Sequence, residues 1–355
     1  MRAAVIGAGS QGRVHALGYR ATPDVRLVAV ADVHRDTAAG LADELNIPQV
    51  FADHRDLLAE RPDVVSVCTP PRFHLDVVTD AVRAGVRAVH CEKPLAMSYD
   101  DARTMVTTAA DAGVQLTFNL QRRFEPVQRF AREAIAAGEI GEVVTFEGYC
   151  PNLFDWGSHI LDLILFHRGD AAPSWVLGQV DVSVNRYVYD AFVETSSLTQ
   201  IAWPDGVRAT VSTGREPDTP VLNTMNDLGI VVQGTTGRVD VRGARCVVRR
   251  FGKEDLVLDT PFDTDTSTWD RGVDPAIVAG TRDAIADLVD SLAADRTPVL
   301  AAEHGLRGAE LVFATYESSR SRRRVRLPLD RGDNALLTGL DQGFWHPTGE
   351  LRSTY

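Results

Sequence analysis

The sequence predicts an α/β Rossmann domain built on a parallel sheet, followed by an α+β domain with an open, mostly antiparallel sheet. Up to about residue 120, short apolar runs alternate with helical patterns, as strands and crossover helices do. The first apolar run enters a glycine turn directly, at Gly7-Ala-Gly9-Ser-Gln-Gly12. Beyond residue 121, longer runs of β character are joined by turns that suit antiparallel hairpins.

Length and charge support two domains and exclude some partners. The chain has 355 residues, more than a single hydrophobic core usually serves, and a net charge of −12. That charge argues against nucleic acid or an anionic membrane as a partner. The first strand begins at Met1 and no run of about 18 apolar residues occurs, so we expect neither a signal peptide nor a membrane span. The cysteines have neither metal-ligand spacing nor a disulfide pattern, which favours a cytoplasmic location.

The first domain is expected to cover residues 1–120 and to bind NAD(P). Its strands are predicted at residues 2–6, 26–31, 64–68, 87–90 and 115–118. Its helices are predicted near residues 11–21, 35–45, 74–84 and 99–112.

The second domain is expected to cover residues 121–329. After a helix near 126–137, strands are predicted at 142–149, 175–185, 195–203, 207–213, 229–233, 238–241, 246–251 and 255–259. Two helices near 275–294 and 302–318 then precede a short strand at 325–329. The tail, 330–355, is too apolar to be treated as disordered, and packing against a neighbour is one interpretation. The basic run at 320–326 is interpreted as a solvated helix end.

The glycine turn predicts a dinucleotide site. Gly7 allows a tight turn, Gly9 lets a pyrophosphate approach the backbone, and Gly12 lets the following helix pack closely on the strand. Asp32 lies 20 positions after Gly12, where its carboxylate can accept the ribose hydroxyls. This favours NAD. The alternatives are NADP, because the cations His34 and Arg35 follow the acid, and a glycine turn that binds no nucleotide.

Two loops follow predicted strands at the edge where open α/β sheets bind ligands. One contains Thr69, Pro70 and His74, and the other contains Glu92 and Lys93. A lysine placed there could donate to a substrate oxygen. The alternative is an ordinary surface Glu-Lys pair at a helix start.

The segment around His159 is the second chemical stretch. On a helix, Asp155, His159 and Asp162 share one face, and the rest of the segment is strongly apolar. A histidine beside a carboxylate can accept a hydroxyl proton near neutral pH. A core histidine satisfied by a neighbouring acid is the alternative. We expect no metal, because Lys93 would compete with it, and we interpret His167 as structural.

Together these residues resemble the glucose–fructose oxidoreductase / inositol dehydrogenase / rhizopine catabolism (Gfo/Idh/MocA) family. The resemblance covers about residues 1 to 329 and rests on the order and spacing of seven motifs: Gly7-x-Gly9-x-x-Gly12, Asp32, Thr69-Pro70…His74, Glu92-Lys93-Pro94, Arg122-Arg123-Phe124-x-Pro126, Gly138-x-Ile-Gly141 and Asp155-x-Gly-x-His159-x-x-Asp162.

The resemblance implies a homodimer or homotetramer, in which residues 121–329 serve substrate binding and oligomerisation. It implies hydride transfer between a nicotinamide and a carbon of a small polyhydroxylated substrate, which is a sugar or cyclitol. It implies that Lys93 polarises the reacting hydroxyl, that His159 accepts its proton, and that Asp155 orients both. It also implies a cis peptide bond before Pro94. We expect the cofactor to be bound by Gly7, Gly9, Ser10, Gln11, Gly12, Asp32, Arg35, Thr69, Pro70, His74, Glu92 and Lys93.

We therefore predict an NAD-dependent dehydrogenase acting on a secondary hydroxyl. The alternatives are a redox-neutral glycosidase, epimerase or dehydratase that oxidises its substrate transiently, and a non-catalytic NAD(H)-binding protein. The chain departs from the family in approaching Asp155 through Tyr149-Cys-Pro-Asn152-Leu-Phe, where relatives often have glycines. The predicted pocket-lining residues are Asn119, Arg122, Tyr149, Asn152 and Trp156.

Overall fold

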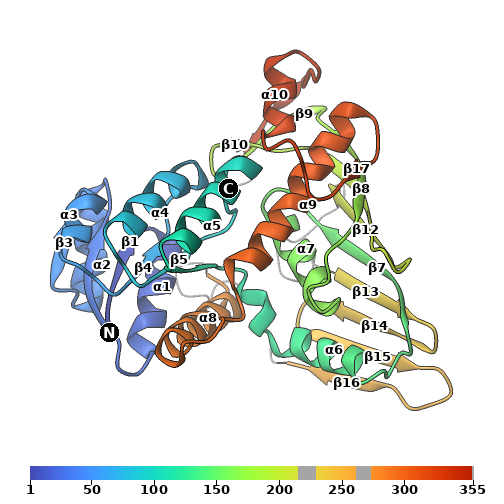
Figure 1. Cartoon of the computed structure of the whole chain (residues 1–355), viewed down its shortest axis with the longest axis horizontal. Helices are drawn as coiled ribbons and strands as arrows, with labels where there is room; N and C mark the ends of the chain where they lie inside the picture. Colours follow the sequence, from blue (N-terminus) through green and yellow to red (C-terminus); the bar gives the residue numbers. More distant parts are fainter. Residues whose placement is uncertain (215–228, 261–272, 354–355) are drawn as a thin grey trace. The chain divides into compact units, whose positions relative to one another are not determined.

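The computed structural model describes residues 1–214, 229–260 and 273–353. These residues form two compact units, labelled by element in Figure 1. The first unit comprises Met1–Met97, Asp101–Phe124 and Asp263–Leu306. The second comprises Ser98–Asp100, Glu125–Phe262 and Arg307–Tyr355.

The first unit is built on a six-stranded parallel sheet with strand order β3-β2-β1-β4-β5-β6. Its central strands are nearly continuous runs of Ala and Val because both faces of the sheet are covered. This confirms the predicted Rossmann domain. The strands are β1 (Arg2–Ile6), β2 (Arg26–Ala31), β3 (Gln49–Phe51), β4 (Val64–Val67), β5 (Ala88–Cys91) and β6 (Gln115–Phe118).

Five helices connect these strands, together with two short 3-10 turns. The helices are α1 (Ser10–Ala21), α2 (Arg35–Leu45), α3 (His54–Ala59), α4 (His74–Arg83) and α5 (Tyr99–Asp111), and the turns are η1 (Pro71–Phe73) and η2 (Gln121–Phe124). β3 and α3 are absent from the elements predicted from the sequence. Both are too short to show a hydrophobic period, and β3 lies at the edge of the sheet, where its side chains are only half-buried.

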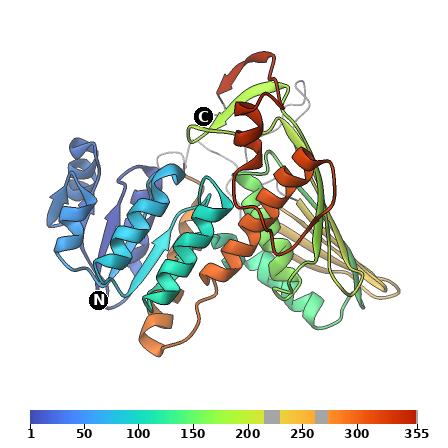
Figure 2. The ribbon, with the colours of Figure 1, turned by 45° about the horizontal axis from the view of Figure 1, so that its top comes forward.

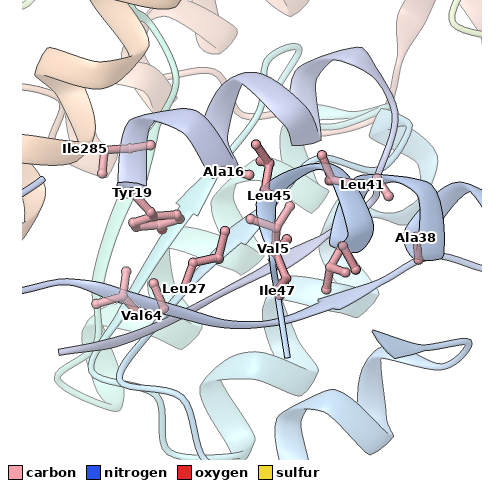
Figure 3. Close-up of a cluster of buried hydrophobic side chains, with 14 of the residues drawn as sticks. Val5, Ala16, Tyr19, Leu27, Ala38, Leu41, Leu45, Ile47, Val64 and Ile285 are labelled. Atoms are coloured by element: carbon pink, nitrogen blue, oxygen red, sulfur yellow. The ribbon is translucent and has the colours of Figure 1, made fainter. Parts of the chain in front are cut away.

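The helix α8 (Pro275–Ala294) packs on the first unit, although it is predicted within the second domain. Its residues Ile285 and Leu288 are buried with Tyr19 of α1 in one apolar cluster, and Figure 3 shows Ile285 beside Tyr19. A Cβ atom at Gly18 of α1 would lie 2.7 Å from Cδ1 of Ile285, so the two helices approach closely. An apolar helix face predicts burial but does not identify the surface that covers it.

The second unit is built on a nine-stranded sheet with order β16-β15-β14-β13-β7-β12-β11-β8-β17. Among the described residues, neighbouring strands of this sheet are antiparallel except β7 and β12, which are parallel. This confirms the predicted α+β class. The strands are β7 (Val143–Cys150), β8 (Trp175–Asp181), β11 (Ser196–Ala202), β12 (Arg208–Gly214), β13 (Gly229–Gly234), β14 (Gly237–Arg242), β15 (Arg245–Arg250), β16 (Leu256–Asp259) and β17 (Val325–Arg326).

Three helices cover one face of this sheet (Figures 1 and 2). They are α6 (Pro126–Ala136) on β14 to β16, α7 (Trp156–His167) on β7, β12 and β13, and α9 (Ala302–Ser321), whose Ser318 accepts a hydrogen bond from the backbone N–H of Gly178 in β8. Buried and exposed residues alternate along β7, β11 and β12, as expected for strands with one covered face.

The run predicted as one strand at 175–185 is two strands, because the chain turns between β8 and β9 (Val184–Val188). β9 lies in a separate three-stranded sheet, between β10 (Ala191–Phe192) and β18 (Gly349–Ser353). The tail therefore packs on its own unit. It contains α10 (Ala335–Asp341), whose N-terminus is capped by the side chain of Asn334.

Candidate active site

Several of the predicted site residues follow immediately after strands of the six-stranded sheet. Gly7, Cys68, Glu92 and Asn119 come directly after β1, β4, β5 and β6, and each donates its backbone N–H to the strand beside it over 2.7 to 2.9 Å. The carboxyl ends of parallel strands meet at one edge of a sheet. The glycine turn, the Thr69 loop and the Glu92-Lys93 loop therefore share this edge.

The glycine turn has the geometry that a pyrophosphate requires. Gly7 has φ +95°, and a Cβ atom there would lie 2.5 Å from the carbonyl oxygen of Cys68. A Cβ at Gly12 would lie 1.9 Å from the carbonyl oxygen of Gly7. At Gly9 a Cβ would meet nothing within 4 Å, and no side chain caps the N-terminus of α1. The uncapped helix start thus fits an anionic dinucleotide.

Asp32 is half-buried at the end of β2 and is held by the backbone. Its Oδ2 accepts the N–H of Ala8 and its Oδ1 accepts the N–H of His34, each over 2.8 Å. Each carboxylate oxygen can accept a second hydrogen bond, so both remain able to receive a ribose hydroxyl. The side chains of His34 and Arg35 are exposed beside it.

Glu92 is the centre of a buried polar network beneath Lys93. Its Oε1 accepts from Nδ2 of Asn119 over 2.8 Å and lies 2.9 Å from Nε2 of His15, while its Oε2 accepts the backbone N–H of Lys93 over 3.0 Å. His15 is completely buried in α1. The helix that begins at the glycine turn is therefore linked through His15 to the loop that carries Lys93.

Further side chains complete this network. Nδ1 of His15 lies 2.8 Å from Oγ of Ser66, whose hydroxyl donates to that of Tyr19 over 2.9 Å. Nδ2 of Asn119 also lies 3.2 Å from Oγ1 of Thr281 in α8. His15, Ser66 and Tyr19 are not among the residues predicted from the sequence. The one signal for His15 was a histidine on the apolar face of the first predicted helix.

The network keeps Glu92 ionised. Burial acts to raise the pKa of Glu92, but the hydrogen bond from His15 and the charges of His15 and Lys93 outweigh it and lower the pKa to about 2. At His90, burial itself lowers the pKa, to about 3, because it disfavours the charged imidazole. A carboxylate thus lies beneath Lys93, with a neutral imidazole at His90.

The side chain of His74 contacts a carbonyl oxygen in each of the two ligand loops. Its Nε2 lies 2.7 Å from the carbonyl oxygen of Thr69 and its Nδ1 lies 3.0 Å from that of Leu95. Burial lowers the pKa of His74, although both carbonyl contacts act to raise it. The side chain is completely buried, so it fixes the loops around Thr69 and Lys93. Lys93 is half-buried, and the Lys93-Pro94 peptide bond is cis, as the resemblance implied.

Arg122 lies in η2 with its side chain buried. Its charge acts to lower the pKa of Asp274, which burial raises overall.

In the second unit, Asp155, His159 and Asp162 are all buried at or on α7. Asp155 directly precedes the helix, and His159 lies in its first turn. Asn152 caps this helix, because its Oδ1 accepts the N–H of Asp155 over 2.7 Å and that of Trp156 over 3.4 Å. The residues predicted to act on the substrate hydroxyl are thus divided between the units, with Lys93 in the first and His159 in the second.

Tyr149 lies apart from these residues within the second unit. Gly148 faces α7, because a Cβ atom there would lie 2.6 Å from Cγ2 of Ile160. Tyr149, its neighbour in β7, therefore points to the opposite face of the sheet, where its hydroxyl donates to Glu147 over 2.9 Å. That hydrogen bond raises the pKa of Tyr149. The structure does not bring Tyr149 together with His159.

Neither a metal cluster nor a membrane helix is found in the described part of the chain. There, no group of three or more His, Cys, Asp or Glu side chains is arranged to hold a metal ion. No helix in the described ranges is long and apolar enough to cross a membrane. All four cysteines are free.

These features define a dinucleotide-binding protein of the Rossmann class. Residues 1–120 match the model of the Gfo/Idh/MocA oxidoreductase family, which has an NAD-binding Rossmann fold. This match covers about a third of the chain.

Three comparisons extend this match. D-glucoside 3-dehydrogenase of Escherichia coli (strain K12) is 41% identical over 145 residues, which are 40% of this chain and 41% of that protein. Inositol 2-dehydrogenase of Rhizobium meliloti (strain 1021) is 29% identical over 262 residues, covering 70% and 77% of the two chains. The crystal structure of an oxidoreductase from Agrobacterium radiobacter in complex with NAD⁺, L-tartaric acid and magnesium has a TM-score of 0.80 at 20% identity, covering 92% and 98%. The match to the first relative thus spans about two fifths of its length.

Proposed function

We propose that this protein is an NAD-dependent dehydrogenase that acts on a secondary hydroxyl of a sugar, sugar derivative or cyclitol. The observation that carries the proposal is the buried carboxylate of Glu92, which supports Lys93 at the sheet edge that also holds the glycine turn and Asp32. The names of the relatives support this substrate class, because a glucoside and an inositol both present ring hydroxyls.

The proposed mechanism divides the work between two side chains. The glycine turn and Asp32 would hold NAD⁺, which would supply the hydride acceptor for the reaction. His159 takes the hydroxyl proton as general base, and Asp155 orients it. The ammonium group of Lys93 donates to the same oxygen and stabilises the negative charge that develops there.

The composition of the chain supports a specific role for Lys93. Of the 37 Lys and Arg residues, only Lys93 and Lys253 are lysines. The chain therefore uses arginine at nearly every position where a solvated cation suffices. An ammonium group is compact and can approach a single oxygen, whereas a guanidinium is broad, planar and permanently charged.

Glu92 gives Lys93 its place and its charge. The bond from the backbone N–H of Lys93 to Oε2 of Glu92 fixes the base of the side chain. The two opposite charges also interact directly, as the low pKa of Glu92 reflects. A carboxylate at this position favours the protonated form of Lys93, which is the form that donates to substrate.

Two measurements, one of turnover and one of NAD binding, test the proposal. Polyols, aldoses, inositols and sugar acids are screened with NAD⁺ and NADP⁺, and reduced nicotinamide is followed by absorbance. With the best substrate, Lys93→Ala and His159→Ala should each lower kcat by at least about a hundredfold and leave NAD binding within about threefold. Lys253→Arg, at an exposed position, is the matched control and should retain full activity.

The outcomes separate the candidate functions. Turnover unchanged in both variants would refute the proposal. Product that forms with catalytic NAD and no accumulation of NADH would indicate a redox-neutral enzyme. Tight NAD binding without turnover of any substrate would indicate a binding protein.

The homo-oligomer implied by the family is also a proposal. Among the described residues, the face of the nine-stranded sheet opposite α6, α7 and α9 carries exposed apolar side chains at Tyr149, Leu177, Leu198 and Val257. Light scattering on the purified protein would identify a dimer or tetramer, and a monomer at micromolar concentration would contradict the expectation.

A further inference from the structure

A buried carboxylate holds the segment between β7 and α7. Glu194 lies between β10 and β11 and is completely buried. Its Oε1 accepts a hydrogen bond from the backbone N–H of Leu153. Its Oε2 accepts the hydroxyl of Tyr316 in α9 over 2.7 Å, and Oγ1 of Thr213 lies 3.4 Å from Oε1.

The same segment is held at two other points. Arg186 in β9 donates to the carbonyl oxygen of Pro151 over 3.1 Å, and Asn152 accepts the N–H of Asp155 over 2.7 Å. The backbone from Cys150 to Asp155 therefore makes hydrogen bonds to side chains of other elements and to one side chain within the segment itself. Asp155 is the last residue of this segment, and His159 lies one helical turn later.

Glu194 is costly for the fold, which favours a positioning role over simple packing. Burial raises its pKa, against the hydrogen bonds from Leu153 and Tyr316 and the charge of Arg186, which act to lower it. An apolar side chain of similar size would avoid the cost of burying a carboxylate, but it would leave the N–H of Leu153 without an acceptor.

We propose that Glu194 is a positioning residue of the active site: its buried carboxylate fixes the Cys150–Asp155 segment and thereby places Asp155 at the start of the helix that carries His159. This rests on the proposed function, in which Asp155 and His159 act on the substrate hydroxyl. A displacement of about 1 Å in such a group can cost about a hundredfold in rate. The glycine turn belongs to the first unit, so we expect the affinity of the protein for NAD not to change.

The test compares three variants of the full chain. Glu194→Ala removes the acceptor for Leu153. Glu194→Gln keeps a carbonyl oxygen that can accept the same N–H, and Tyr316→Phe removes only the second contact of the carboxylate. We expect kcat to fall at least about tenfold in Glu194→Ala, with the Kd for NAD within about twofold. Glu194→Gln should recover most of the activity, and Tyr316→Phe should stay within about threefold of wild type.

A second readout does not depend on turnover. Hydrogen–deuterium exchange of the peptide containing Leu153 should be slow in the wild type and at least about tenfold faster in Glu194→Ala, while peptides from α1 and β1 stay unchanged. Faster exchange in a protein that turns over no substrate would support the anchor and refute the proposed function. Unchanged exchange in Glu194→Ala, or unchanged kcat despite faster exchange, would overturn the positioning role. If Glu194→Ala does not fold, Glu194→Gln provides the test. The proposal expects this variant to retain most of its activity, so a complete loss of activity in Glu194→Gln would refute the assignment.

Discussion

Replacing Glu92 by glutamine should lower stability in a way that depends on pH. The substitution keeps the size of the side chain and one oxygen acceptor but removes the charge that His15, Asn119 and the backbone of Lys93 satisfy. The pKa of Glu92 is lowered from 4.5 to about 2. This difference corresponds to about 3 kcal/mol of stabilisation when the carboxylate is ionised.

The pH window follows from the direction of this shift. Because the carboxyl has a lower pKa in the folded protein than in the unfolded chain, its stabilisation is fully present well above pH 4.5 and is lost as the pH falls towards 2. Roughly 2 of the 3 kcal/mol should be gone at pH 3. The wild type should therefore exceed Glu92→Gln by about 3 kcal/mol at pH 7 and by about 1 kcal/mol at pH 3.

Urea unfolding at pH 7 and pH 3, followed by circular dichroism, measures these differences. Glu303→Gln is the control, because Glu303 is exposed in the same unit and its replacement should leave the pH dependence unchanged. A difference between wild type and Glu92→Gln that stays constant from pH 7 to pH 3 would refute the buried ion network.

Four further predictions follow from the first unit. Gly12→Ala should weaken NAD binding at least about tenfold in a calorimetric titration, because its Cβ would lie 1.9 Å from the carbonyl oxygen of Gly7, whereas Gly40→Ala, with nothing within 4 Å, should bind normally. Asp32→Ala should lose about 2 kcal/mol of NAD affinity, roughly thirtyfold in Kd, and little affinity for NADP; a wild type that prefers NADP would contradict the ribose assignment. Ile285→Ala should lower the free energy of unfolding by about 2 to 4 kcal/mol, and a loss below about 1 kcal/mol would contradict the packing of α8 on α1. In Lys253→Arg, reductive methylation with ¹³C-formaldehyde labels Lys93 as the only side-chain amine, and its NMR titration should move to lower pH when Glu92→Gln is added.

The regular elements of the first unit could be predicted because their signals are local. Strands such as Arg2–Ile6 and Val64–Val67 are apolar runs bounded by turns, and helices such as Arg35–Leu45 follow them at short distances. The three residues of Gln49–Phe51 form a strand only because β2 offers them a sheet edge. That signal is tertiary and does not appear in the pattern of the strand itself.

The return of α8 to the first unit shows the same limit over a longer range. Gly18 and Ile285 are far apart in the chain. They fit together because Gly18 on α1 has no side chain and leaves room for the branched side chain of Ile285 on α8. Each helix alone reads as amphipathic. A single domain boundary near residue 120 assigns every later residue to the second domain. It therefore could not assign α8, which follows the second sheet in the chain, to the first unit.

In the first unit, hydrogen-bond partners separate predicted site residues into two groups that residue type alone could not distinguish. Asp32 and Lys93 are half-buried at the sheet edge, where a ligand can meet them. Asn119 and His74 also follow strand ends, yet only 1% and 0% of their surface is exposed, and they contact Glu92 and the carbonyl oxygens of two loops. These hydrogen-bond partners favour support of the ligand-binding groups over direct contact. Because a polar residue after a strand satisfies either role, the sequence predicts where the site lies, and the hydrogen-bond partners decide which residues hold it in place.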